Sequence, residues 1–134
     1  MILTGGCQCG AVRYEVSSEP LAIYVCHCRE CQRQSASAFG ISVIVPAAAF
    51  NLTQGKLGSW RRPTDSGRVL DCRFCVACGS RVYHAGPGET VVSVKGGSLD
   101  SPVDLSTASH IWTSRKLPGV IIPAGAAQHV EEPE

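Results

Sequence analysis

Residues 5–16, GGCQCGAVRYEV, join a tight cysteine turn to a short stretch of alternating side chains. In that stretch Val12, Tyr14 and Val16 share one face of an extended chain, and polar residues occupy the other face. The alternation predicts a half-buried strand that begins just after the turn. Because a CxC turn can present two sulfurs to one metal ion with little strain, the stretch predicts a strand fixed to a metal site.

Short strands of this kind recur along the rest of the chain. Glycine and proline interrupt the sequence every few residues, and no long segment has a helical apolar period. The pattern predicts a mainly β fold of packed antiparallel sheets, with strands at residues 11–16, 21–25, 39–45, 50–53, 69–74, 81–84, 90–95 and 109–112. One or two helical turns are expected at residues 30–36, and another turn at 46–50.

Length and composition are typical of one globular domain. The chain has 134 residues, of which 44% are hydrophobic and 17% charged. That is enough to bury a core, and it is too apolar for a disordered protein. We therefore expect a single domain over residues 1–134, with a loose C-terminal tail from about residue 124.

Charge and hydropathy exclude several classes of partner. The formal net charge of +1 gives no attraction to nucleic acid or to an anionic membrane, and there is no basic tract. The first residues lack the features of a signal peptide, and no apolar run is long enough to span a membrane. We expect a cytoplasmic protein without nucleic-acid or membrane partners. The oligomeric state is not predicted.

The eight cysteines are concentrated in three short motifs. Cytoplasmic thiols are kept reduced, so these spacings favour zinc ligands over disulfides. The motifs are CxC at Cys7 and Cys9, CHCREC at Cys26, Cys28 and Cys31, and CVAC at Cys75 and Cys78. We interpret the remaining Cys72 as a buried residue of a strand, although it could instead complete a zinc site.

Two of these motifs together form a natural closed site. Tetrahedral zinc takes four ligands, and two tight turns from distant parts of the chain can supply them. The predicted set is Cys7, Cys9, Cys75 and Cys78. We expect a structural zinc there.

The third motif predicts an open, catalytic zinc. Cys26, Cys28 and Cys31 supply three thiolates and leave a fourth position for water or a substrate atom. This second zinc could be labile. Three residues could instead supply a fourth ligand and close the site: His27, Cys72 and His110.

Several other polar residues could act beside this zinc. His27 could relay a proton, although alternation in an extended CHC turn favours a side chain that points away from the metal. Arg29 or Arg33 could guide an acidic thiol, and a solvated helix face is the alternative. His110 and Trp112 could line a pocket, or they could simply belong to a strand. Arg61, Arg62 and Arg68 could bind substrate carboxylates, or they could face water.

Three segments in this order resemble the glutathione-dependent formaldehyde-activating enzyme family, which includes centromere protein V. They are GGCQCGAVRYEV, CHCRECQRQSASAF and FCVACGSRVY. GGSLDSP and HIWTSRKLP also look like that family, so the resemblance runs from about Gly5 to Pro118. It differs in two places: Gly119 follows KLP where relatives often have an aromatic residue, and Ser35 and Ala36 stand where they often have SG.

The resemblance implies a β-tent fold of several packed sheets organised around zinc. It also implies that Cys7, Cys9, Cys75 and Cys78 hold a structural zinc, and that Cys26, Cys28 and Cys31 hold a catalytic one. In the family's type reaction, glutathione adds to formaldehyde to give S-(hydroxymethyl)glutathione, and the reverse is a carbon–sulfur lyase step.

Our leading hypothesis is therefore a zinc-dependent carbon–sulfur lyase, similar to S-(hydroxymethyl)glutathione synthase. It would condense a small thiol such as glutathione with formaldehyde or a related electrophile. The alternative is a non-catalytic zinc module that binds a protein, which predicts that a fourth protein ligand closes the second site.

Overall fold

The computed structural model describes residues 2–133, which are mainly β, as predicted. One α-helix, α1 (Arg29–Ser35), accompanies ten strands. The strands are β1 (Leu3–Gly6), β2 (Arg13–Val16), β3 (Ala22–Cys26), β4 (Gly40–Pro46), β5 (Phe50–Gln54), β6 (Leu57–Pro63), β7 (Val69–Cys75), β8 (Arg81–Ala85), β9 (Val91–Lys95) and β10 (Ser109–Ile111). Three short 3-10 turns are η1 (Ala47–Ala49), η2 (Gly96–Ser98) and η3 (Thr113–Arg115). No helix in this part of the chain is long and apolar enough to cross a bilayer.

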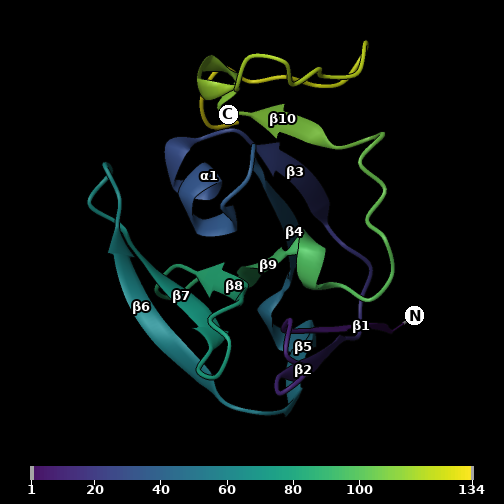
Figure 1. The fold of residues 1–134 in the computed structure, drawn as a ribbon, viewed down its shortest axis with the longest axis vertical. Helices are drawn as coiled ribbons and strands as arrows, with labels where there is room; N and C mark the ends of the chain where they lie inside the picture. The colour runs from purple at the N-terminus through teal and green to yellow at the C-terminus, as the bar shows by residue number, and fades with distance from the viewer. Residues whose placement is uncertain (1, 134) are drawn as a thin grey trace.

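The strands form two sheets. The larger has seven strands in the order β10-β3-β4-β9-β8-β7-β6, and the smaller has three in the order β1-β2-β5. Figure 1 shows α1 on the inner side of the curved larger sheet, above β6, β7 and β8. Every neighbouring pair is antiparallel except β10 and β3, which are parallel. The larger sheet is thus mixed, and the prediction of antiparallel pairing was wrong for this one pair.

All eight predicted strands are present, with boundaries shifted by at most two residues. The predicted helical turns are also present, as α1 and the 3-10 turn η1. Two strands, β1 and β6, were not predicted. The sequence of β1 is LTGG, and that of β6 is LGSWRRP, so neither is rich in β-branched residues. β6 is an edge strand, which explains its exposed Arg61 and its terminal proline.

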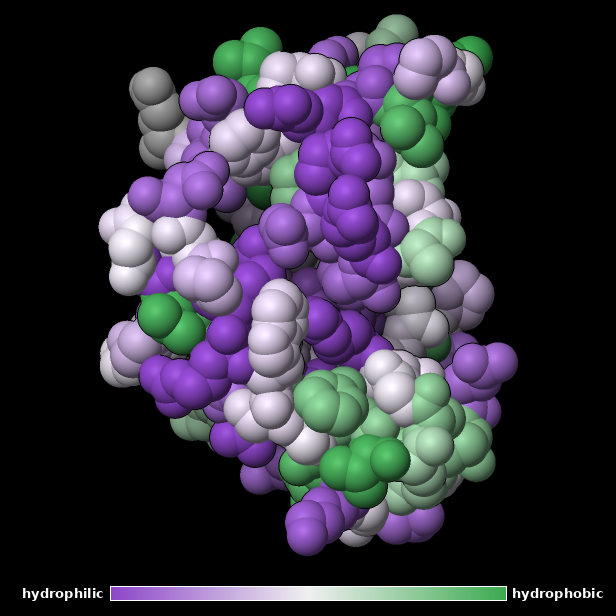
Figure 2. Space-filling view, turned by 60° about the vertical axis from the view of Figure 1, so that its left-hand side comes forward, coloured by the Kyte–Doolittle hydropathy of each residue, from purple (hydrophilic) through white to green (hydrophobic). Residues whose placement is uncertain are grey.

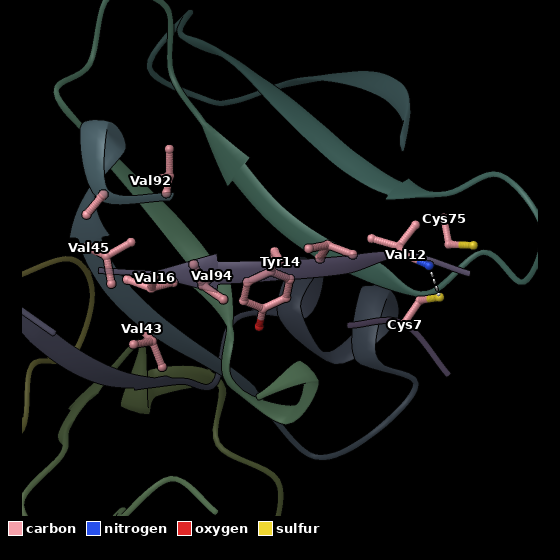
Figure 3. Close-up of a cluster of buried hydrophobic side chains, with 11 residues drawn as sticks. Cys7, Val12, Tyr14, Val16, Val43, Val45, Cys75, Val92 and Val94 are labelled. Carbon is pink, nitrogen blue, oxygen red and sulfur yellow. Dashed lines mark hydrogen bonds between the residues drawn. The ribbon is translucent and has the colours of Figure 1, made fainter. Parts of the chain in front are cut away.

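The main core lies between the two sheets (Figure 3). Val12, Tyr14 and Val16 are at most 1% exposed, as their alternation predicted. They pack against valines of the larger sheet, including Val43 and Val94. Full burial of each such side chain contributes about 1.5–3 kcal/mol. This apolar layer holds the two sheets together.

The C-terminal segment is attached to β10. His110 donates from its backbone N to the Ala127 carbonyl at 2.8 Å and accepts from the backbone N of His129 at 2.9 Å. Trp112 also donates from its indole N to Glu132 at 2.9 Å. These contacts contrast with the loose tail expected from about residue 124, because β10 is the end strand of its sheet and offers unpaired backbone groups.

Candidate metal centres and the adjoining pocket

The structure brings together the sulfurs of the four cysteines predicted to form a closed site. Cys7, Cys9, Cys75 and Cys78 have Sγ atoms within 4.8 Å of one another. The Sγ of Cys9 lies 3.6 Å from that of Cys7 and 3.8 Å from that of Cys75. Ligands in a tetrahedral zinc–sulfur site are about 3.8 Å apart, since each Zn–S bond is about 2.3 Å. The donor set therefore fits a tetrahedral metal ion.

Local turns aim these sulfurs. Gly10 and Gly79 follow the two motifs with φ of 82° and 81°, a conformation that glycine adopts without strain. Backbone N–H groups of Val12 and Ala77 donate to the sulfurs of Cys7 and Cys75 at 3.2 and 3.3 Å. Donors of this kind favour thiolates, the form that binds a metal. The turns are thus built for anionic sulfur.

The second cluster is formed where β3 passes into α1. Cys26 ends β3, Cys28 is the N-cap of α1, and Cys31 lies in the first helical turn. Their Sγ atoms also lie within 4.8 Å of one another. Within residues 2–133, no fourth His, Cys, Asp or Glu joins this group. None of the three alternative ligands, His27, Cys72 and His110, therefore belongs to it.

Hydrogen bonds among the three thiols shift their pKa values in opposite directions. Bonds with Cys26 and then Cys31 lower the pKa of Cys28 to about 2. The bond with Cys28 is the largest cause of a raised pKa at Cys26. The backbone N of Cys31 also donates to the Cys28 sulfur at 3.3 Å. The cluster thus concentrates negative charge on one sulfur while neighbouring thiols share their protons, and a metal cation would replace those protons.

His27 lies outside the sulfur cluster. Its side chain is fully buried, and its Nε2 is 2.9 Å from Nδ1 of His110. Burial is the main cause of a lowered pKa at both histidines. The side chain therefore joins the CHC loop to β10 from within the protein, which matches the preferred orientation away from the metal.

A pocket of about 270 Å³ adjoins the second cluster, between α1 and the larger sheet. Cys31 and other residues of α1 form one part of its wall, and four strands, β6 to β9, supply the rest. The lining residues are Glu30, Cys31, Arg33, Gln34, Trp60, Arg62, Cys72, Arg81, His84 and Lys95. Figure 2 shows that hydrophilic side chains predominate around a hollow on this side of the molecule. Cys72 is 1% exposed, which confirms its prediction as a buried strand residue.

The sequence pattern did not single out three basic residues of this pocket, Arg81, His84 and Lys95. Lys95 is only 9% exposed, and its Nζ donates to Nδ1 of His84 at 2.8 Å. Burial, followed by nearby cations of which Lys95 is the largest, lowers the pKa of His84 to about 3. Burial also lowers the pKa of Lys95. The only signal was Lys95 itself, a charged residue at the end of an otherwise apolar strand.

Some of the other candidate residues line a second hollow of about 460 Å³. Its lining includes Cys28, Arg29, Arg62 and Trp112. His110, by contrast, is 5% exposed and bonded to His27. Of the two other candidate arginines, Arg61 is exposed to solvent, and Arg68 forms a salt bridge with Glu89. The three-cysteine cluster therefore lies between two hollows, with Cys31 on one and Cys28 on the other.

Comparisons with known proteins agree with this arrangement. The family model described as glutathione-dependent formaldehyde-activating enzyme matches residues 2–115. A crystal structure of a Rhodobacter sphaeroides protein is similar in fold, with a TM-score of 0.57 and 21% identity, over 94% of this chain and 98% of that one. The family match spans both cysteine clusters and the pocket between α1 and the larger sheet. The chain belongs to the glutathione-dependent formaldehyde-activating enzyme family, as its sequence motifs indicated.

Proposed function

We propose that this protein is a zinc-dependent enzyme that joins the sulfur of a small thiol, such as glutathione, to formaldehyde or a related electrophile. In reverse it would be a carbon–sulfur lyase. The observation that carries the proposal is the three-cysteine cluster, which has no fourth ligand among residues 2–133 and whose Cys31 faces a pocket. An open coordination position beside a cavity is the usual arrangement of a catalytic zinc.

The proposal assigns a zinc ion to each cluster within a β-tent fold. Cys7, Cys9, Cys75 and Cys78 would hold the structural ion, and their sulfur spacing supports this assignment. The catalytic ion would be held by Cys26, Cys28 and Cys31. A reducing compartment such as the cytoplasm would keep these sulfurs available as ligands.

The chain's own residues determine which chemistry suits the second site. Three thiolates around a divalent cation leave a net negative centre, which suits exchange of thiolate ligands better than hydrolysis. A zinc ion bound there would lower the pKa of an incoming thiol. The pocket beside Cys31 would hold that thiol and its carbonyl partner together.

The proposed reaction is a simple addition. The thiol sulfur forms a bond to the formaldehyde carbon, the carbonyl π pair moves to oxygen, and that oxygen takes up the proton that the thiol loses. The product is an S-hydroxymethyl thioether. No oxidant or reductant is required.

Exchange NMR tests this proposal. Glutathione, carbon-13 formaldehyde and their adduct would be mixed at equilibrium with zinc-loaded protein, with Cys31→Ser, and with buffer alone. We expect exchange to be faster than in buffer with the native chain and equal to buffer with Cys31→Ser. The metal content, measured by inductively coupled plasma mass spectrometry, should fall from two zinc ions to one in Cys31→Ser and stay at two in Cys72→Ala.

Two results would contradict the proposal. If exchange with the native chain is no faster than in buffer, the protein does not catalyse the glutathione reaction. Retention of both zinc ions by Cys31→Ser removes Cys31 as a ligand. Loss of turnover together with tight retention of two ions would favour the alternative of a non-catalytic zinc module.

A further inference from the structure

Basic side chains supply much of the lining of the pocket that adjoins Cys31. Its lining includes Arg33, Arg62, Arg81 and Lys95 but only one carboxylate, that of Glu30. Glu30 is paired with Arg62 at 3.7 Å. The remaining cations around this cavity therefore exceed the acidic groups.

Lys95 is the most deeply buried of these cations. It is 9% exposed, and no Asp or Glu in residues 2–133 forms a salt bridge with it. Its one hydrogen-bond partner at the ammonium group, among the described residues, is a neutral imidazole, because Nδ1 of His84 accepts from Nζ and therefore carries no proton of its own. Buried charges are normally paired with an opposite charge. The cavity wall thus contains an ammonium group without a carboxylate partner.

Arg81 forms no salt bridge with an Asp or Glu of residues 2–133. Its guanidinium carbon lies 5.4 Å from the centre of the Trp60 ring, in a cation–π arrangement. Such stacking orients the planar fork while leaving its N–H groups free for an oxygen ligand. Trp60 and Arg81 both line the pocket.

From these contacts we propose that Lys95 and Arg81, assisted by Arg62, bind a carboxylate of the thiol substrate. This inference rests on the proposed function and deepens it, because it names the residues that would bind the carboxylate of an acidic thiol and so select it over a neutral one. Its sulfur would lie at the three-cysteine cluster and its carboxylate at the basic wall of Arg62, Arg81 and Lys95. A cavity of about 270 Å³ lies below the range of about 300–1,000 Å³ common for drug-sized ligands, so it holds a small acid or one arm of glutathione.

Lys95 could also act on the cysteine cluster itself. A cation beside three thiolates stabilises their negative charge, and Cys31 and Lys95 share this pocket. The two roles make different predictions. Neutralising the cluster would help every thiol equally, whereas binding a carboxylate would help only anionic thiols.

The test compares two thiols with the same carbon chain, 3-mercaptopropionate and its methyl ester, in which a methyl group removes the negative charge. Formaldehyde adduct exchange would be measured for the native chain, Lys95→Met, Arg81→Gln and two matched controls. The controls are Lys56→Met and Arg61→Gln, which remove the same charges from exposed positions. We expect Lys95→Met and Arg81→Gln to raise KM for the acid by about 10- to 100-fold and to leave the ester unchanged.

A second measurement does not depend on turnover. S-methylglutathione has the carboxylates of glutathione but no free thiol, and its binding can be followed by NMR line shape. Its Kd should rise in Lys95→Met and Arg81→Gln by the same factor as KM, and should be unchanged in the two controls. Arg81 lies on a partly exposed surface, so Arg81→Gln remains informative if Lys95→Met does not fold.

The outcomes separate this inference from the proposed function. Equal KM values for acid and ester in the native chain, or equal losses for both in Lys95→Met, would overturn the carboxylate site while leaving the enzyme proposal intact. A different outcome is that no thiol shows faster adduct exchange than in buffer, while S-methylglutathione still binds and its binding requires Lys95. That result would support the carboxylate site and contradict the proposed reaction.

Discussion

His27 and His110 form a buried pair, with Nε2 of the first 2.9 Å from Nδ1 of the second. One ring donates and the other accepts, so the accepting imidazole must be neutral, and burial lowers the pKa of both rings. His27 belongs to the CHC loop and His110 to β10. The pair therefore connects the cysteine cluster to the strand at one end of the larger sheet.

The first prediction concerns this connection. His110→Ala would leave Nε2 of His27 without a partner and open a cavity beside it, so we expect a loss of roughly 2–4 kcal/mol in the free energy of unfolding. Zinc in the three-cysteine cluster should also be released faster. Urea denaturation and transfer of zinc to a chelator would measure the two effects. His129→Ala is the matched control, and native stability in His110→Ala would contradict the prediction.

A second prediction follows from the packing of Gly40 against Cys31. A Cβ at Gly40 would lie 3.0 Å from Cβ and 3.2 Å from Sγ of Cys31. Gly40→Ala would therefore displace one ligand of the three-cysteine cluster. We expect zinc affinity there to fall by about tenfold, comparable to the loss of a ligand-orienting neighbour. Competition with a chromophoric chelator would measure the change.

Gly97→Ala provides the control for that experiment. A Cβ at Gly97 meets no atom within 4 Å, and the residue does not have positive φ. Its zinc affinity should equal that of the native chain. If Gly40→Ala behaved in the same way, contact with Gly40 would have no part in positioning Cys31.

A third prediction concerns the end of α1. Ala36 has φ of 51° and ψ of 42°, a left-handed conformation in which a Cβ is unfavourable. Ala36→Gly should raise the free energy of unfolding by about 0.5–1 kcal/mol, after the added flexibility of the unfolded chain is included. Thermal unfolding would show the change, and Ala38→Gly, where φ is not positive, should not stabilise the protein.

A fourth prediction is a pH dependence due to His84. Burial and neighbouring cations lower its folded-state pKa to about 3, whereas an unfolded histidine has a pKa of about 6.5. Between these values the unfolded state binds more protons, so this contribution to stability is fully present above pH 6.5 and is lost as pH falls toward 3. The slope is at most about 1.4 kcal/mol per pH unit.

His84→Asn tests this contribution because the amide oxygen can still accept from Lys95 but does not titrate. The difference in unfolding free energy between the native chain and this variant should change between pH 7.5 and 5. Acid release of metal affects both proteins and cancels in the difference. Parallel curves would show that His84 titrates normally in the folded protein.

The sequence predicted those features that arise from local pattern. Alternation identified the inward face of β2, and motif spacing identified both cysteine groups. It could not predict β1, because Gly5 and Gly6 have little strand preference. The tertiary reason is visible only in the structure, where the Tyr14 hydroxyl, 2.6 Å from the Ser98 oxygen, leaves no room for a Cβ at Gly5.

The pocket was predicted only in part for the same reason. Arg33 and Arg62 were recognised as candidates because of their sequence context, but Lys95 and His84 come from β9 and β8, which contain no motif. The curvature of the sheet brings these strands beneath α1. The parallel pairing of β10 with β3 was equally hidden, since it joins residues more than eighty positions apart.

The two cysteine clusters differ in how far apart their members lie in the chain, which gives them different histories during synthesis. Cys26, Cys28 and Cys31 leave the ribosome together, whereas Cys7 and Cys9 must wait for Cys78. At usual translation speeds, that delay is roughly 3 to 14 seconds. The nascent chain therefore has all three cysteines of the three-cysteine cluster before the fold can close. The four-cysteine site is completed last, when β7 and the CVAC turn have emerged.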